Sequence, residues 1–234
     1  MSIKIVSFDA AHTLVDVNWN PGGFAVQMVT ELGENTDQQV AIETYNNLMY
    51  SRWGHFKELN LQRNHEVCQG FWRELTADWA QRMGLSTDPM RITEHANNRI
   101  YAADSPVYRV FADTVPTLRR LQDAGYRMMV VSNWDVSLHL VMQTFGLSPF
   151  FERIFASLEW GPEKPDRELF SIVEAEMNLL PREILHIGDN PIDDFQGARG
   201  AGWHAALIDR NLADRDGIRL STLTQVPDLL AEFV

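Results

Sequence analysis

The chain has 234 residues, enough to bury the core of one large domain, or of one domain that carries an insert. Hydrophobic residues make up 45% and charged residues 22%, as in globular proteins, and no apolar run approaches the roughly twenty residues of a membrane span. The net charge of −12 argues against a nucleic-acid partner, because phosphate backbones attract a basic surface and no basic stripe is present.

The N-terminus and the cysteine content bear on the compartment. Residues 1–4 lead into an apolar strand without the charged-then-apolar layout of a signal peptide. The single cysteine, Cys68, allows neither an internal disulfide nor a zinc cluster. We therefore expect a cytoplasmic protein that binds no membrane.

The first predicted element is a short apolar run over residues 3–8, which is typical of a buried strand and ends at Asp9. Residues 18–105 contain no convincing strand and are dominated by helical periodicity. Helices are predicted there over residues 24–32, 37–56, 64–83 and 90–101.

Strand–helix alternation begins near residue 106 and indicates a parallel sheet with helices on both faces. Helices are predicted over residues 115–124, 136–145 and 168–179 and from about residue 194, and strands over 128–131, 153–156, 184–187 and, as the last one, 205–208. The sequence thus predicts an α/β fold: a Rossmann-like, doubly wound parallel sheet formed by residues 1–17 and 106–234, with an all-helical cap inserted over residues 18–105.

Four clusters of polar residues lie at or beyond the ends of predicted strands. In chain order they cover residues 9–14, 132–133, 164–166 and 188–194. Each cluster alone has an ordinary explanation as a turn or a helix cap. Ligands bind beyond the carboxyl ends of the strands in open parallel sheets, so the four clusters are expected to converge on one site.

In residue type and order, these clusters resemble the four motifs of the haloacid dehalogenase superfamily. Its Asp-x-x-x-Thr is matched by Asp9 and Thr13, its serine by Ser132, its lysine by Lys164, and its Gly-Asp-x-x-x-x-Asp by Gly188, Asp189 and Asp194. Segments 132–135 and 188–199 are similar to the branch called haloacid dehalogenase-like hydrolase domain-containing protein three. The similarity covers nearly the whole predicted core, whereas the cap matches only in position and helical character.

The resemblance implies a magnesium-dependent phosphatase that acts on a small phosphorylated metabolite. Asp9 would attack phosphorus and form an aspartyl-phosphate, which divides one difficult step into two. Asp9, Asp189 and the backbone carbonyl of Ala11 would hold Mg²⁺, which prefers oxygen ligands. Asp194 or Asp193 would bind the metal through water or orient the motif lysine.

The same resemblance assigns the groups that bind the phosphoryl group. Ser132 and the amide of Asn133 would hold a phosphate oxygen. Lys164 would neutralise the charge shared between Asp9 and the transferred group.

Ala11 departs from the pattern of the superfamily's phosphatases, whose second residue after the nucleophile is usually an aspartate. That aspartate protonates the leaving group and then activates water, and a missing general acid–base costs about 10² to 10⁴ in rate. A good leaving group, such as that of an acyl or aryl phosphate, departs without a proton. We interpret His12 as a solvated turn residue, although His12 or an aspartate near Asp194 is an alternative activator of the water.

Three further functions stay open. A phosphoryl-ligand-binding scaffold with little or no turnover would keep all the other motif residues. Phosphonate-cleaving members carry Asp-x-Ala at the first motif and use a cap lysine as a Schiff base; Lys57 is the only lysine of the predicted cap, and an exposed helix-end residue is its simpler interpretation. Dehalogenases lack the magnesium acids of the fourth motif, so Asp189 and Asp194 count against dehalogenation. The sequence determines neither the substrate nor the oligomeric state.

Overall fold

The computed structural model describes residues 3–233 and divides into two compact units. One unit runs up to Val17 and resumes at Arg109, and the other is Asn18–Tyr108. The sequence placed the corresponding boundaries at 17/18 and 105/106. The assignment of the two units as a catalytic core and a substrate cap stays a prediction.

The first unit contains a six-stranded sheet in which every neighbouring pair of strands runs parallel. In spatial order the strands are β5 (Arg153–Ala156), β4 (Arg127–Ser132), β1 (Ile5–Phe8), β6 (Ile184–Gly188), β7 (His204–Ile208) and β8 (Arg219–Leu220). From β1 the chain builds outward to β4 and β5 on one side, and then to β6 and β7 on the other. The order therefore reverses at β1, and ligands bind at such a switch point.

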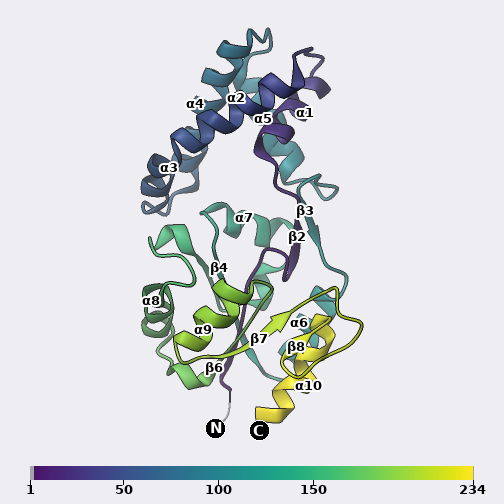
Figure 1. Cartoon of the computed structure of the whole chain (residues 1–234), viewed down its shortest axis with the longest axis vertical. Coiled ribbons are helices and arrows are strands. Elements are labelled where there is room, and N and C mark those ends of the chain that lie inside the picture. Colours follow the sequence, from purple (N-terminus) through teal and green to yellow (C-terminus); the bar gives the residue numbers. More distant parts are fainter. Residues whose placement is uncertain (1–2, 234) are drawn as a thin grey trace. The chain divides into compact units, whose positions relative to one another are not determined.

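Helices cover both faces of this sheet, with α8 and α9 on one face and α6 and α10 on the other (Figure 1). The helices are α6 (Thr114–Asp123), α7 (Ser137–Thr144), α8 (Arg167–Met177), α9 (Gly197–Gly200) and α10 (Val226–Leu230). Short 3₁₀ turns lie at Ser148–Phe150, Ser157–Glu159, Pro181–Glu183, Leu223–Gln225 and Ala231–Phe233, and a π-helical segment, η4, covers Pro191–Gln196. Leu169, Phe170 and Val173 of α8 are fully buried in one hydrophobic cluster with Ile5 and Phe155 of the sheet. Burial of the strands on both faces explains their nearly continuous apolar sequences.

A second, two-stranded sheet lies where the chain leaves and re-enters the first unit. It pairs β2 (Val15–Val17) with β3 (Tyr108–Val110). Beyond it, the amide of Asn18 donates to the carbonyl of Val107 at 2.8 Å. The two ends of the helical unit are therefore tied directly to each other.

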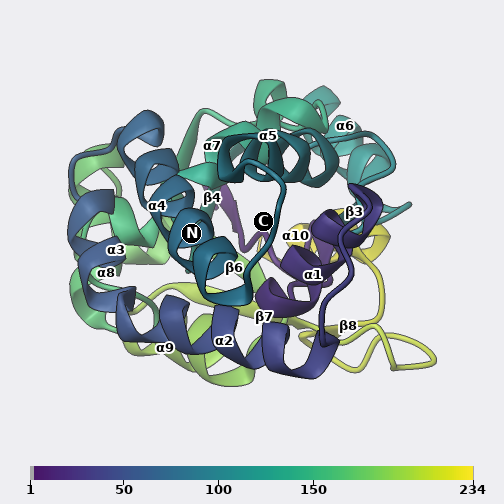
Figure 2. The ribbon, with the colours of Figure 1, turned by 90° about the horizontal axis from the view of Figure 1, so that it is seen from above.

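The helical unit, seen from above in Figure 2, contains five helices, all within the described residues. They are α1 (Pro21–Glu31), α2 (Gln38–Ser51), α3 (Trp53–Asn60), α4 (His65–Met83) and α5 (Pro89–Ile100). Side chains of Asn20, Asp37, Asn64 and Asp88 accept hydrogen bonds from backbone amides and so cap α1, α2, α4 and α5. The caps explain why these four helices begin where they do. No described helix of the chain combines the length and the apolar character needed to cross a bilayer.

The predicted α/β fold is confirmed, with three differences in its elements. The helix predicted over 37–56 is two helices, because the chain departs from helical geometry at Arg52 (φ −110°, ψ 3°). The Arg52 guanidinium donates to Asp78 of α4, a tertiary contact that the local pattern does not reveal. The strand predicted as the last one is followed by β8 and α10. The strands β2 and β3 were not predicted either. The three unpredicted strands β2, β3 and β8 have two or three residues, too few to show an alternating pattern.

Asp113, at the start of α6, joins three segments of the first unit. Its carboxylate accepts hydrogen bonds from Arg210 at 2.9 Å, from the hydroxyl of Thr222 at 2.7 Å and from the amide of Leu223 at 2.9 Å. Arg210 in turn donates to the carbonyl of Thr13 at 2.7 Å, so this cluster also holds the loop that follows β1. Burial alone would raise the pKa of Asp113, but these donors outweigh burial and lower it below its ordinary value.

The first prediction concerns Asp113→Asn, which removes the charge but keeps the shape. We expect the free energy of unfolding at pH 7 to fall by about 2 kcal/mol, the scale of a hydrogen bond to a charged group. A depressed carboxyl pKa stabilises the fold above the unfolded-state pKa, and that stabilisation is lost as the pH falls through the folded-state pKa. The difference from wild type should therefore shrink in urea unfolding at about pH 3.

Asp123→Asn, at an exposed position of the same helix, is the control and should change stability by less than about 0.5 kcal/mol. Equal effects of the two substitutions at pH 7 would contradict the role of Asp113.

Candidate active site

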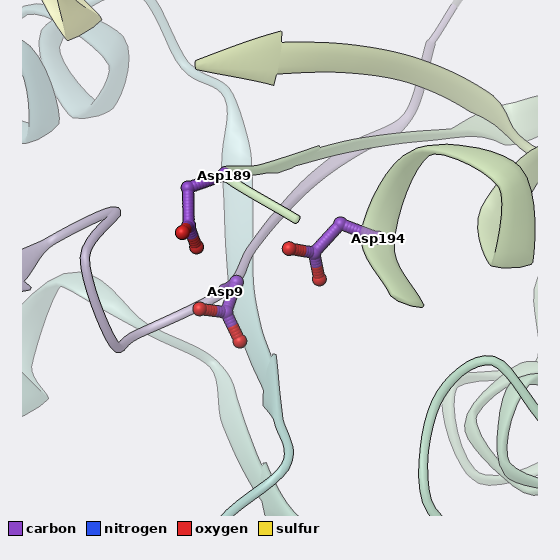
Figure 3. A group of neighbouring side chains, drawn as sticks. All are labelled: Asp9, Asp189 and Asp194. Atoms are coloured by element: carbon purple, nitrogen blue, oxygen red, sulfur yellow. The ribbon is translucent and has the colours of Figure 1, made fainter. Parts of the chain in front are cut away.

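Three carboxylates come together at the switch point of the sheet. Asp9 follows β1, Asp189 follows the neighbouring strand β6, and Asp194 belongs to η4. Each offers an oxygen within 4.8 Å of the other two, and Figure 3 shows the three side chains pointing toward one another. Oxygen ligands in such a cluster suit a hard divalent cation.

Lys164 is the cation of this site, and its side chain is almost completely buried. Its Nζ donates to Asp9 Oδ1 at 2.7 Å, to the carbonyl of Val131 at 2.9 Å and to Asp194 Oδ1 at 2.5 Å. An ammonium group has three N–H bonds, so all three are accounted for. The lysine therefore has one well-defined position between two carboxylates.

Asp194 is placed by the turn that follows β6. The amide of Asn190 donates to Asp194 Oδ2 at 2.9 Å, and the amide of Asp194 donates to the carbonyl of Asn190 at 3.1 Å. The carboxyl group lies directly over Gly188: a Cβ atom there would come within 2.1 Å of Asp194 Cγ. Glycine is therefore required at 188 by this close approach.

The charges of the site do not balance. Burial raises the pKa of Asp9 from 3.8 to about 6 against the opposing effect of Lys164, and the negative charges of Asp194 and Asp189 add to the rise. Burial and then Asp194 raise the pKa of Asp189 as well. Burial would also raise the pKa of Asp194, but Lys164 and His186 hold it well below its usual range. Burial would lower the pKa of Lys164, but Asp9 and Asp194 outweigh burial and raise it. One lysine thus faces three carboxylates, two of which it contacts directly, and an excess of negative charge remains in the cluster.

Two further residues expected from the sequence, Ser132 and Asn133, follow the apolar part of β4. Ser132 is 1% exposed, and its hydroxyl has no hydrogen-bond partner among the described residues. The side chain of Asn133 accepts from the amide of Lys164 at 2.7 Å and donates to the Lys164 carbonyl at 2.8 Å. Asn133 therefore holds the backbone that carries the lysine, a contact that the sequence did not predict.

The other candidate residues lie in less enclosed positions. Ala11 is half-buried in the turn after Asp9, and His12 is exposed with a left-handed φ of 54°. Asp193 is half-buried and accepts from the side chain of Asn190 at 3.0 Å, so of the two neighbouring aspartates it is Asp194 that contacts the lysine. Lys57 is half-buried on α3 of the helical unit.

His186 is a residue of the site that sequence reasoning missed. It is fully buried on β6, and its two ring nitrogens lie 2.8 Å from Ser7 Oγ and 3.1 Å from Asp194 Oδ1. Burial lowers its pKa. His186 lies within the strand predicted over residues 184–187 and was not named as a candidate, yet Ser7 and His186 are register partners on neighbouring buried strands. Two polar residues in such strands, close before Asp9 and Asp189, are the signal that could have revealed the pair.

A buried carboxylate held by a lysine, with further acids able to hold a cation, is typical of hydrolases that use a carboxylate nucleophile. A model of the haloacid dehalogenase-like hydrolase family matches residues 3–202, and the chain belongs to this family.

Relatives with known names agree with this membership. The chain is 26% identical over 214 residues to haloacid dehalogenase-like hydrolase domain-containing protein 3 of Danio rerio, covering 89% of this chain and 86% of that protein. The predicted similarity to that branch is thus confirmed. This chain is also 32% identical over 123 residues to glyceraldehyde 3-phosphate phosphatase of Methanothermobacter thermautotrophicus, covering 49% of this chain and 52% of the relative.

Solved structures agree in fold. The 2-haloacid dehalogenase from Pseudomonas syringae pv. Tomato DC3000 matches with a TM-score of 0.67 at 20% identity, over 99% of this chain and 100% of that one. At this identity the match supports the fold alone.

The second prediction tests the close approach at Gly188. Gly188→Ala should displace the Asp194 carboxyl group and lower the free energy of unfolding by about 1 to 3 kcal/mol, as overpacking of a tight interior does. Thermal unfolding measures the effect.

Gly200→Ala is the matched control, because a Cβ atom at this helical position meets nothing within 4 Å. It should leave stability unchanged or raise it by up to about 1 kcal/mol. Equal loss of stability in the two variants would mean that Asp194 does not set the requirement for glycine.

Proposed function

We propose that the chain is a magnesium-dependent phosphatase that hydrolyses a small phosphorylated metabolite through an aspartyl-phosphate on Asp9. The observation that carries the proposal is the convergence of Asp9, Asp189 and Asp194 around Lys164 at the switch point of the sheet. The similarity to a named phosphatase supports the same class of reaction.

Magnesium fits this group of residues. The available donors are carboxylate oxygens, which Mg²⁺ prefers, and three carboxylates face one lysine, so a further cation would relieve their mutual repulsion. We assign Asp9, Asp189 and the backbone carbonyl of Ala11 as ligands, with Asp194 bound through water or acting only on Lys164. The bound ion would orient the phosphoryl group and neutralise part of its charge.

Asp9 performs the covalent step. One of its carboxylate oxygens attacks phosphorus as the bond from phosphorus to the leaving oxygen breaks, and water then attacks the aspartyl-phosphate to release inorganic phosphate and regenerate the carboxylate. Lys164 holds Asp9 Oδ1 and supplies positive charge where the phosphoryl oxygens gather charge. The buried hydroxyl of Ser132, which has no hydrogen-bond partner within residues 3–233, would bind one of those oxygens together with the amide of Asn133.

Ala11 restricts the range of substrates. Its methyl group neither donates nor accepts a proton, so the leaving group departs without general-acid help. Acyl or aryl phosphates, whose leaving groups are stable anions, are the substrates that this site favours.

Ala11 also supports a second candidate function, a protein that binds a phosphoryl ligand with little turnover. The groups proposed to bind the phosphoryl group and the metal do not depend on an acid at position 11, so binding would persist without efficient hydrolysis. Turnover of an acyl phosphate distinguishes the two functions.

The experiment that tests the proposal is a screen of the purified protein against phosphate monoesters and acyl phosphates, with and without Mg²⁺. Asp9→Asn keeps the shape but removes the nucleophile, so turnover of any substrate found should fall to background. His12→Ala should retain activity within about threefold, because the histidine is exposed and is not assigned to the chemistry.

Calorimetry separates the metal site from turnover. Asp189→Ala should weaken Mg²⁺ binding strongly, since it removes one of the proposed ligands. Equal Mg²⁺ affinity in wild type and Asp189→Ala would rule out the proposed metal site, and equal loss of turnover in Asp9→Asn and His12→Ala would contradict the assigned roles.

A separate prediction restores the missing acid. Ala11→Asp should raise hydrolysis of an alkyl phosphate by a fraction of the roughly 10² to 10⁴ that positioned acid–base catalysis supplies. An acyl phosphate should gain less, because its leaving group needs no proton. The measurement is the ratio of mutant to wild-type rates for one substrate of each kind.

No gain for either substrate, with Mg²⁺ still bound, would contradict the phosphatase and favour the binding protein. Ala10→Asp is not a usable control, because Ala10 is fully buried; His12→Asp places the acid at an exposed neighbouring position and should give no gain.

A further inference from the structure

His186 makes two hydrogen bonds, one at each ring nitrogen. Nδ1 lies 2.8 Å from the hydroxyl of Ser7 on β1, and Nε2 lies 3.1 Å from Asp194 Oδ1. The ring is fully buried and also packs edge-on against Trp203. A buried imidazole with both nitrogens engaged has a fixed orientation.

The partners determine where the ring carries its proton. A carboxylate only accepts hydrogen bonds, so Nε2 carries the proton and donates it to Asp194. Nδ1 then has a free lone pair and accepts from the Ser7 hydroxyl, which is able to donate. Asp194 therefore selects the tautomer, and the Ser7 hydroxyl satisfies the remaining nitrogen by donating to Nδ1.

Asp194 is held on several sides at once. Its Oδ1 accepts from His186 and from Lys164, while its Oδ2 accepts from the amide of Asn190. Without the donor at Nε2, the Asp194 carboxyl group can rotate about its Cβ–Cγ bond. It would then present a different oxygen to Lys164. Lys164 would then lose the geometry in which a single ammonium bridges Asp194 and Asp9.

We propose that His186 is a positioning residue that holds Asp194 in the orientation that keeps Lys164 against Asp9, with Ser7 satisfying the other ring nitrogen. The inference rests on the proposed function for its effect on catalysis, but not for its effect on the position of the lysine. His186 touches neither the substrate nor the reacting atoms, and acts through Asp194 alone.

Three substitutions separate this role from simple packing. His186→Phe keeps a ring against Trp203 but removes both nitrogens. His186→Gln keeps an N–H donor near the position of Nε2. Ser7→Ala removes the hydroxyl that donates to Nδ1 and leaves the imidazole and its bond to Asp194 in place.

The first readout does not depend on activity. The chain has only three lysines, Lys4, Lys57 and Lys164, so the side-chain ¹⁵N ammonium signal of Lys164 can be identified in lysine-labelled protein with a Lys4→Arg, Lys57→Arg double variant. A buried ammonium with three acceptors exchanges slowly and should give a sharp signal in wild type. We expect this signal to broaden or disappear in His186→Phe and to persist in His186→Gln.

The second readout is the tautomer itself. Long-range ¹H–¹⁵N correlations of histidine-labelled wild type should show His186 protonated at Nε2 and not at Nδ1. Ser7→Ala leaves the Asp194 carboxylate in place, so His186 should stay protonated at Nε2. A wild-type ring protonated at Nδ1 would overturn the proposal whatever the activity, and this test remains available if His186→Phe does not fold.

The third readout is kinetic, on whichever substrate the phosphatase screen identifies. His186→Phe should lower kcat by about 10- to 100-fold, the range typical of residues that orient a metal or catalytic group, with KM within about threefold. His186→Gln should recover most of kcat. Equal loss in the Phe and Gln variants, with the Lys164 signal intact in both, would overturn the proposal.

The proposed phosphatase function and the positioning role of His186 can be contradicted independently. If wild type turns over no substrate, the proposed function is contradicted, while the ammonium and tautomer spectra still decide the role of His186. If wild type is active and the Lys164 signal is unchanged in His186→Phe, the phosphatase stands and the positioning role is wrong.

Discussion

One buried ammonium group holds the site together. Lys164 Nζ contacts the end of β1 through Asp9, the end of β4 through Val131 and the turn after β6 through Asp194. Taking charges out of water is expensive, and a buried ion pair offsets that cost only when the remaining donors and acceptors are satisfied. Removing one partner of such a pair typically costs about 3 to 5 kcal/mol, because a buried charge is then left uncompensated. The segments that carry the chemistry are therefore held together by the Lys164 ammonium group, and few other side chains could replace it.

The strand ends could be predicted from the sequence because two independent signals coincide there. Apolar runs of four to six residues mark the buried strands, and polar residues such as Asp9, Ser132 and Asp189 follow them immediately. The carboxyl ends of parallel strands lie at the same edge of the sheet. The fold class alone therefore predicts that the residues that follow these strands lie close together. Lys164 was harder to place, because its position depends on a loop. Only the resemblance to the superfamily's motifs indicated that this lysine belongs to the site.

Other features depended on contacts that no local pattern contains. The motif spacing favoured Asp194, but the sequence left open whether Asp193 or Asp194 acts on the lysine; the wide turn of η4 directs Asp194 inward over Gly188. His186 lies among apolar residues, so its role is visible only once β1 and β6 are set in register with Ser7 opposite. The interruption at Arg52 coincides with a contact to Asp78, 26 positions further along the chain.

The direct bond between Asn18 and Val107, at 2.8 Å, has a consequence for how the family can diversify. The two ends of the helical unit are joined by one hydrogen bond. The unit is therefore inserted into the rest of the chain in the way that a surface loop is. The free-energy cost of closing a loop rises only slowly with its length, by about 0.6 kcal/mol for each doubling. Insertions, deletions or wholesale exchange between residues 18 and 107 therefore leave the register of β1 with its neighbours untouched. Evolution can alter this module independently of the carboxylates that the sheet presents.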